Sequence, residues 1–204
     1  MIIDNNPPGW KGEFMLPSVL EGIFKERFEV IHYLSIDLEK CVKSPRVKSV
    51  ILSGSTYLLS AQGVRKLFDR EISLIKIIGK PLLGICHGHQ LLALSYGGEV
   101  IKMGSRVKGF KSVEVVKEDP IFEGLSKRFM VWENHREEVR ETPKDFLLLA
   151  ISKECKVEAM KHKDYPLYGL QFHPEKFTDA NPAGLRILQN FMKIVFQNAK
   201  TSSS

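Results

Sequence analysis

A cysteine between two glycines, at the boundary between an apolar segment and a helical one, constrains this chain more than any other feature. Residues 81–85 are apolar and typical of a buried strand, and residues 87–96 are typical of a helix. Cys86 lies at the boundary, two residues from Gly84 and two from Gly88. This is the spacing of the strand–turn–helix elbow that carries hydrolase nucleophiles. The tight turn needs small neighbours, because adjacent backbone must pass without Cβ clashes.

Cys86 has two interpretations. At the first turn of a helix, unpaired N–H groups and the helix dipole favour the thiolate, which is the nucleophilic form. The alternative is a small apolar side chain packed in the core, as is common for a free cysteine.

A histidine and a glutamate at the end of a second apolar segment favour the nucleophile. Residues 167–172 are typical of a strand, and His173, Pro174 and Glu175 follow directly. Proline ends the strand and fixes the direction of its neighbours. Taken singly, His173 is equally typical of a loop and Glu175 of a solvated surface. Together with a cysteine elbow, they are the base and the acid that a Cys-His-acid triad requires.

Strand-like and helix-like segments alternate through the first half of the chain, which favours a mostly parallel sheet. We therefore predict an α/β fold with a mostly parallel central sheet, helices on both faces and a small β-rich excursion. The excursion covers residues 99–117, with turns at Gly104 and Gly109. We expect a single domain over residues 1–200 and a disordered tail over 201–204. The expected strands are 1–3, 29–34, 48–53, 81–85, 129–133, 146–151, 157–162 and 167–172. The expected helices are 16–28, 37–42, 57–78 with a break near Gly63, 87–96 and 182–198.

Three of these expected strands end in residues suited to one reaction. Gly54, Cys86 and His173 each follow a strand directly, and the carboxyl ends of parallel strands meet at one edge of the sheet. The backbone N–H groups of Gly54 and His87 are candidate donors to an oxyanion. The sequence therefore predicts a nucleophile, a base and an oxyanion hole in one crevice.

The motifs Gly84-x-Cys86-x-Gly88-x-Gln90 and Phe172-His173-Pro174-Glu175 resemble those of the class I glutamine amidotransferases. The likeness extends from Ile2 to about Phe196. Within this family the chain is most similar to the separate glutaminase subunit of archaeal-type GMP synthetases. That narrower likeness is carried by residues 121–125, 131–139, 157–162 and 168–175.

The resemblance implies a flavodoxin-like amidotransferase fold and a Cys86-His173-Glu175 triad that hydrolyses glutamine to glutamate and ammonia through a thioester. It implies no cofactor and no metal. It also implies that Gln90 contacts the bound glutamine and that His135 faces a separate synthetase of the ATP-pyrophosphatase type, which makes GMP from XMP. The implied backbone contacts to glutamine are Gly109, Phe110, Lys111 and Ser112.

One departure from the family pattern leaves alternatives open. The family has Gly-Gly-Pro after the third strand, where this chain has Gly54-Ser55-Thr56. Serine resists the positive φ angles that glycine tolerates, so we expect low glutaminase activity until a partner reshapes the loop. The alternatives are a freestanding hydrolase of γ-glutamyl compounds and a degenerate regulatory subunit. The chain has no motif for ATP pyrophosphatase chemistry, so any amination must occur on another protein.

Composition excludes several other functions. The net charge is +6, but the lysines are spread along the chain among acids, so we expect no nucleic-acid partner. No apolar run reaches the roughly 18 residues of a membrane helix, and no signal peptide is visible at Met1. Cys41, Cys86 and Cys155 are too few and too scattered for a disulfide framework or a zinc site. We expect a cytoplasmic protein.

Overall fold

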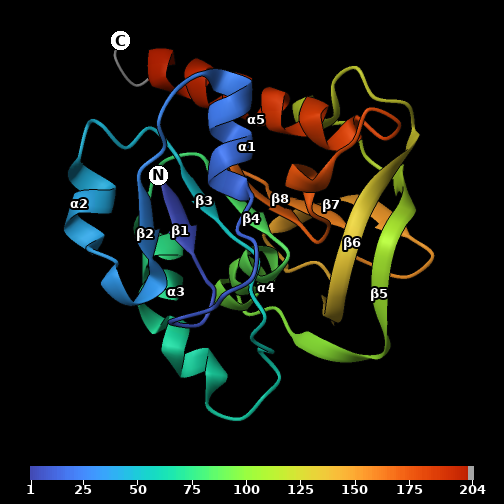
Figure 1. The fold of residues 1–204 in the computed structure, drawn as a ribbon, viewed down its shortest axis with the longest axis horizontal. Coiled ribbons are helices and arrows are strands. Elements are labelled where there is room, and N and C mark those ends of the chain that lie inside the picture. Colours follow the sequence, from blue (N-terminus) through green and yellow to red (C-terminus); the bar gives the residue numbers. More distant parts are fainter. Residues whose placement is uncertain (202–204) are drawn as a thin grey trace.

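The central strands of the sheet are apolar on both sides, and helices cover both of their faces (Figure 1). Alternate residues of a strand point to opposite faces. Ile2 and Leu83 pack into a cluster that includes helices α1 and α5, whereas Ile3 and Leu82 pack into a second cluster with α2, α3 and α4.

The computed structural model describes residues 1–201. Its helices are α1 (Leu16–Phe24), α2 (Leu38–Lys43), α3 (Asp69–Ile77), α4 (His87–Ser95) and α5 (Ala183–Thr201), with 3₁₀ turns at Tyr33–Ser35, Val64–Phe68, Pro120–Phe122 and Pro174–Lys176.

The described strands form one sheet in the order β2-β1-β3-β4-β9-β8-β7-β5-β6. Strands β2, β1, β3, β4 and β9 run parallel, and each later neighbour from β8 to β6 is antiparallel. The strands are β1 (Ile2–Asp4), β2 (Val30–His32), β3 (Val50–Leu52), β4 (Leu82–Ile85), β5 (Val100–Val115), β6 (Arg128–Val139), β7 (Phe146–Ser152), β8 (Ala159–His162) and β9 (Leu167–Leu170).

The α/β class and the helices on both faces are confirmed, but the mostly parallel sheet is not. The expected small excursion is a large antiparallel half of the same sheet. Its strand β5 runs through the expected turns: Gly109 has a φ of 101° yet stays paired with Glu133 of β6, and the irregularity lies between Lys102 and Val107. Figure 1 shows β5 and β6 side by side as a long ribbon at one end of the molecule.

The antiparallel half curls until its last strand touches the segment after β9. The N–H of His173 donates to the carbonyl of Trp132 at 2.8 Å, and these two residues form an isolated antiparallel bridge. Trp132 lies in β6, which pairs with β5 on its other side. The segment that carries His173 is therefore held by both halves of the sheet.

Two expected helices are shorter than the sequence pattern indicates. The first ends at Phe24 instead of residue 28, because Lys25 adopts a left-handed φ of 57°. Residues 57–63 of the second are not helical; the chain enters a 3₁₀ turn at Val64 after Gly63, which has a φ of 80°. The apolar spacing of 57–63 instead reflects burial of Leu59 in the second cluster.

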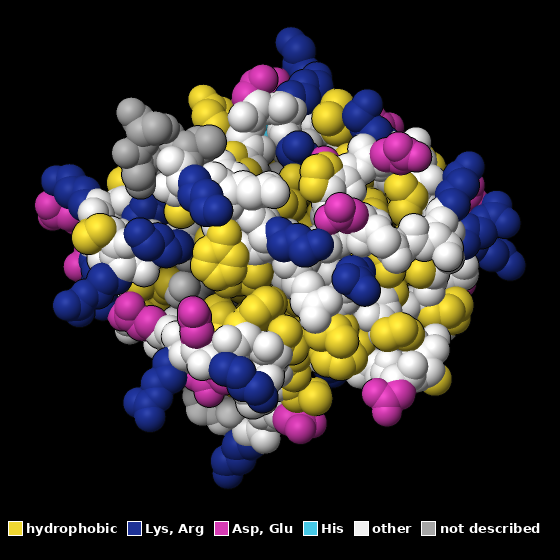
Figure 2. All heavy atoms as spheres, turned by 90° about the horizontal axis from the view of Figure 1, so that it is seen from above, with side chains coloured by type: hydrophobic (Ala, Val, Ile, Leu, Met, Phe, Trp, Pro, Cys, Tyr) yellow, Lys and Arg dark blue, Asp and Glu magenta, His cyan; other side chains and the backbone are white. Residues whose placement is uncertain are grey.

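The last helix, α5, extends to the end of the described chain. It includes Thr201, the first residue of the expected tail, and 202–204 lie outside the described residues. Within residues 1–201, none of the helices has the length and apolar content that crossing a membrane requires. On the face above α1 and α5, basic side chains are dispersed among acidic and hydrophobic ones (Figure 2).

Candidate active site

Cys86 lies on a strained turn between β4 and α4. Its φ of 51° and ψ of −98° fall outside the usual regions for a residue with a side chain. The surroundings fix this conformation: the N–H of Cys86 donates to the carbonyl of Leu170 at 2.8 Å, and the N–H of Gly88 donates to the carbonyl of Ser53 at 3.2 Å. Strained residues of this kind are typical of functional sites.

The two glycines of the elbow permit close backbone approach. A Cβ on residue 84 would lie 2.5 Å from the carbonyl oxygen of Gly88, and a Cβ on residue 88 would lie 2.6 Å from that of Leu52. Both distances are shorter than any real Cβ contact. Only glycine therefore allows α4 to start so close to β3 and β4.

His173 and Glu175 lie beside the thiol, on the segment after β9. The Nδ1–H of His173 donates to Oε1 of Glu175 at 2.7 Å, which leaves Nε2 for Cys86. Burial disfavours the charged imidazole, but the Glu175 carboxylate and the Cys86 thiolate, which is also a hydrogen-bond partner, outweigh burial and raise the pKa of His173 well above its usual value. The structure thus brings all three expected triad residues together.

The expected oxyanion donors flank the thiol. A Cβ on residue 54 would lie 3.7 Å from Cβ of Cys86 and 2.9 Å from Cε1 of His173, so Gly54 is directly against both. Among residues 1–201 no hydrogen bond takes up the N–H of Gly54. His87 is the first residue of α4, where backbone N–H groups lack helical partners.

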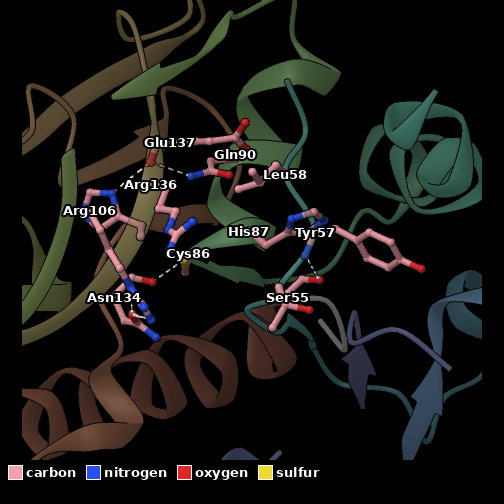
Figure 3. Close-up of a pocket in the computed structure, with 12 residues that line it drawn as sticks. Ser55, Tyr57, Leu58, Cys86, His87, Gln90, Arg106, Asn134, Arg136 and Glu137 are labelled. Atoms are coloured by element: carbon pink, nitrogen blue, oxygen red, sulfur yellow. Dashed lines mark hydrogen bonds between the residues drawn. The ribbon is translucent and has the colours of Figure 1, made fainter. Parts of the chain in front are cut away.

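The thiol opens into a cavity of about 280 Å³, which is close to the lower end for small-molecule sites. Figure 3 shows the side chains of β5 and β6 on one side and those of the loop after β3 on the other, with Cys86 between them. Arg106 and Arg136 make the β5–β6 side basic. The lining residues are Ser55, Thr56, Tyr57, Leu58, Cys86, His87, Gln90, Arg106, Asn134, His135, Arg136 and Glu137.

Comparison with known proteins settles the family. Residues 25–195 match the family model described as "Glutamine amidotransferase class-I". The chain belongs to the class I glutamine amidotransferases. As such, it is a glutamine-hydrolysing enzyme.

Relatives of this amidotransferase share a narrower name. The chain is 40% identical over 153 residues to the glutamine-hydrolysing GMP synthase subunit of Pyrococcus furiosus, covering 75% of this chain and 78% of that protein. It is 40% identical over 157 residues to the subunit of the same name from Methanocaldococcus jannaschii, covering 77% and 79%. A crystal structure assigned to a GMP synthase subunit from Thermoplasma acidophilum superposes with a TM-score of 0.81 at 30% identity, covering 100% of this chain and 96% of that one.

The expected position of His135 is wrong for this amidotransferase. Along β6, residues 131, 133, 135, 137 and 139 are buried, while Asn134 and Arg136 alternate with them. The His135 side chain is 1% exposed, its Nδ1 is 2.9 Å from the carbonyl of Glu137, and its Nε2 is 3.2 Å from Oε2 of Glu133. A ring buried in this way presents no surface to a partner. His135 is buried because alternate residues of a strand face the same side, and β6 extends past His135 to Val139. The strand expected from the sequence ended at residue 133, so this alternation was not applied to His135.

The other expected glutamine contacts divide into two groups. Gln90 lines the cavity, but its Nε2 already donates to the carbonyl of Glu137 at 3.0 Å and to Oε1 of Gln171 at 3.1 Å. Gly109, Phe110, Lys111 and Ser112 lie in β5 opposite residues 130–133 of β6 and do not line the cavity. Their contact with glutamine stays a prediction.

Sequence reasoning missed three residues at the site. Nε2 of Gln171 is 3.6 Å from the sulfur of Cys86, and Asn134 Oδ1 accepts hydrogen bonds from the guanidinium of Arg106. The third, Glu137, crosses the cavity to the loop after β3. Gln171 directly precedes Phe172 and His173, so its position next to the histidine motif could have indicated that it lies near the thiol.

The remaining histidines of the elbow helix are structural. Burial lowers the pKa of His87 to about 3, and its ring packs on Phe68 with centroids 4.5 Å apart. Burial also lowers the pKa of His89 to about 3. Within residues 1–201, no group of three or more His, Cys, Asp or Glu side chains is arranged to hold a metal ion.

Proposed function

We propose that this chain is the glutaminase subunit of a two-subunit GMP synthase. It hydrolyses glutamine and supplies ammonia to a separate synthetase of the ATP-pyrophosphatase type, which converts XMP to GMP. The arrangement of His173 and Glu175 beside Cys86, which lines the cavity, is the observation that carries the proposal. The shared name of relatives at 40% identity supports the choice of GMP synthesis.

The first half of the reaction releases ammonia. The Cys86 thiolate attacks the side-chain carbonyl carbon of glutamine, and the N–H groups of Gly54 and His87 stabilise the oxyanion. The His173 imidazolium then gives its proton to the amide nitrogen, the C–N bond breaks, and ammonia leaves a thioester on Cys86. In other enzymes, removal of one oxyanion donor costs about 3 kcal/mol.

The second half releases glutamate. Neutral His173 accepts a proton from water as the water oxygen attacks the thioester, and the C–S bond then breaks to restore the thiolate. Glu175 holds the imidazole in the tautomer with Nδ1–H and stabilises its cation. Each proton that His173 donates in the first half is therefore regained in the second.

The substitution of serine for the second family glycine does not distort the loop. Lys25 and Cys86 are the non-glycine residues with positive φ within residues 1–201, so Ser55 keeps an ordinary backbone conformation. Its hydroxyl donates to the carbonyl of Asn5 at 2.6 Å. We retain the prediction that a partner raises the glutaminase activity.

Because Cys41, Cys86 and Cys155 are free thiols, we also infer a reducing, cytoplasmic location.

Reconstitution tests the proposal. Glutamate release from glutamine is measured with ATP and XMP, in the presence and absence of the synthetase subunit of an archaeal GMP synthase. We expect the synthetase to stimulate glutamate release and the mixture to form GMP. Cys86→Ala should abolish GMP formation from glutamine but not from ammonium chloride, which bypasses this chain.

Two results would favour the alternatives instead. Full glutaminase activity without any synthetase, with faster turnover of γ-glutamyl peptides than of glutamine, would indicate a freestanding hydrolase. Failure of a glutamine-mimicking electrophile to label Cys86 would indicate a regulatory subunit.

A further inference from the structure

The carboxylate of Glu137 crosses the cavity and binds the backbone of the opposite wall. Its Oε2 accepts the N–H of Leu59 at 2.7 Å, and its Oε1 accepts the N–H of Ser60 at 2.9 Å. Glu137 lies in β6, 77 and 78 residues away from these partners in the chain, and is 2% exposed. Hydrogen bonds of an ionised acceptor with two successive N–H groups are stronger than neutral ones and define a geometry.

The wall that Glu137 holds is irregular backbone, anchored by a few hydrogen bonds and by the packing of Tyr57 and Leu59. Residues 55–60, here called the wall loop, form neither helix nor strand and connect Gly54 to the turn at Gly63. At its start, the hydroxyl of Ser55 donates to the carbonyl of Asn5 and accepts the N–H of Tyr57 at 3.1 Å. At its end, the carboxylate of Glu137 supplies the cross-cavity contact. Few hydrogen bonds therefore fix the backbone of the wall loop, beside the side-chain packing of Tyr57 and Leu59.

The wall loop is adjacent to the reacting groups. Residues 55–58 line the cavity that contains Cys86 (Figure 3), and Gly54, the candidate oxyanion donor, directly precedes them. Leu59 is buried in the second cluster, and its carbonyl accepts from Nε of Arg65 at 3.2 Å. A movement at residues 59 and 60 would therefore displace the cavity wall that directly follows the donor.

Glu137 is also connected to the nucleophile through its backbone. Its carbonyl accepts from Nε2 of Gln90, Gln90 donates to Oε1 of Gln171, and Nε2 of Gln171 is 3.6 Å from the sulfur of Cys86. One residue of β6 thus contacts both the wall loop and the side chains behind the thiol. Since both carboxylate oxygens already accept backbone N–H groups, Glu137 has a holding role instead of a substrate-binding one.

We propose that Glu137 is a positioning residue for glutamine hydrolysis, which fixes the wall loop and thereby the oxyanion donor at Gly54. This inference rests on the proposed function and adds to it a residue outside the triad. The carboxylate oxygens of Glu137 are occupied by the wall loop, so its effect on the reaction runs through that loop. Its loss should reduce kcat more than it raises KM, because the donor at Gly54 acts in the transition state.

The test compares Glu137→Gln with wild type and with Glu141→Gln, a matched change at an exposed residue near the end of β6. We expect kcat for glutamine to fall about tenfold or more in Glu137→Gln, with KM changed less than threefold. Alkylation of Cys86 by iodoacetamide, which needs no oxyanion hole, should stay within twofold of wild type. Glu141→Gln should match wild type in every measurement.

Two further measurements keep the test independent of folding and of the proposed function. Hydrogen exchange at the amides of Leu59 and Ser60 should be faster in Glu137→Gln, and Glu137→Asp, which retains the charge on a shorter side chain, should recover part of both kcat and protection. Should wild type fail to hydrolyse glutamine even with a synthetase, the proposed function fails. The rate of Cys86 labelling by a glutamine-mimicking electrophile then replaces kcat as the readout for Glu137.

Three outcomes would overturn the inference. Unchanged exchange at residues 59 and 60 would show that Glu137 does not hold the wall loop. Faster exchange with unchanged kcat would show that the loop position is irrelevant to the reaction. A parallel fall in iodoacetamide alkylation would place the effect on the thiol itself.

Discussion

At the scale of single residues, the site places a strained cysteine within reach of an unusually basic imidazole. The positive φ of Cys86 costs on the order of 1–3 kcal/mol, which the packing of β3, β4 and α4 must offset. In return, the sulfur projects from the turn toward His173. The imidazolium is favoured by Glu175 on one side and by the thiolate on the other, against the effect of burial.

The first prediction concerns the pH dependence of catalysis. Because Glu175 raises the pKa of His173, Glu175→Gln should lower it, so the imidazolium that protonates the leaving nitrogen is lost at a lower pH. The alkaline limb of the kcat profile should therefore move to lower pH. The value of kcat should also fall, by about 10²-fold or more. Steady-state kinetics across pH measure both effects, and an alkaline limb that stays in place would contradict the role given to Glu175.

Single residues also show what sequence can predict about the site. Cys86, His173 and Glu175 could be found because short-range motifs fix them at the ends of strands. Glu137 could not be found in this way, since its role depends on two N–H groups nearly 80 residues away. His135 was misplaced because its burial depends on the full length of β6.

At the scale of elements, the β4–α4 elbow depends on close backbone contact at Gly84 and Gly88. A Cβ at either residue would prevent that contact. Long-range contacts, by contrast, determine the secondary structure of the segments for which the sequence pattern predicted the wrong element. Residues 57–63 carry helical apolar spacing, yet Glu137 and the core hold them as a loop. Gly109 suggests a turn, yet pairing with Glu133 keeps it within β5.

The second prediction uses two glycines with opposite surroundings. Gly84→Ala should lower the free energy of unfolding by more than about 2 kcal/mol, because the added Cβ meets backbone at 2.5 Å. Gly22→Ala, in the exposed part of α1 with nothing within 4 Å, should raise it by up to about 1 kcal/mol. Urea unfolding of both variants measures this, and equal effects of the same sign would refute the close-approach account.

At the scale of the whole molecule, buried carboxyl groups lie on both the parallel and the antiparallel side, in α3 and in or next to strands β6 and β8. In the parallel half, burial raises the pKa of Glu71 to about 8, although a hydrogen bond from Asn5 acts against burial. In the antiparallel half, burial raises the pKa of Glu133 to about 7 and that of Glu158 well above its usual value. These groups keep their protons in the folded state while the unfolded chain releases them.

The third prediction follows from that difference. Between about pH 4.5 and pH 8, Glu71 holds a proton in the folded state that the unfolded chain has released, so its contribution to the free energy of unfolding should fall as pH rises. Glu71→Gln should remove that contribution, which is about 3 kcal/mol between pH 5.5 and pH 8.5. Urea unfolding at the two pH values measures the effect, with the exposed Glu26→Gln as control. An unchanged pH dependence in Glu71→Gln would show that Glu71 is ionised in the folded protein.

The hydrogen bond from the His173 N–H to the carbonyl of Trp132 has a mechanical consequence. It makes the base part of a joint between two structural units, so that bending β6 outward would draw the imidazole away from the sulfur. The position of Trp132 therefore affects the distance between the imidazole and the sulfur, although Trp132 does not line the cavity.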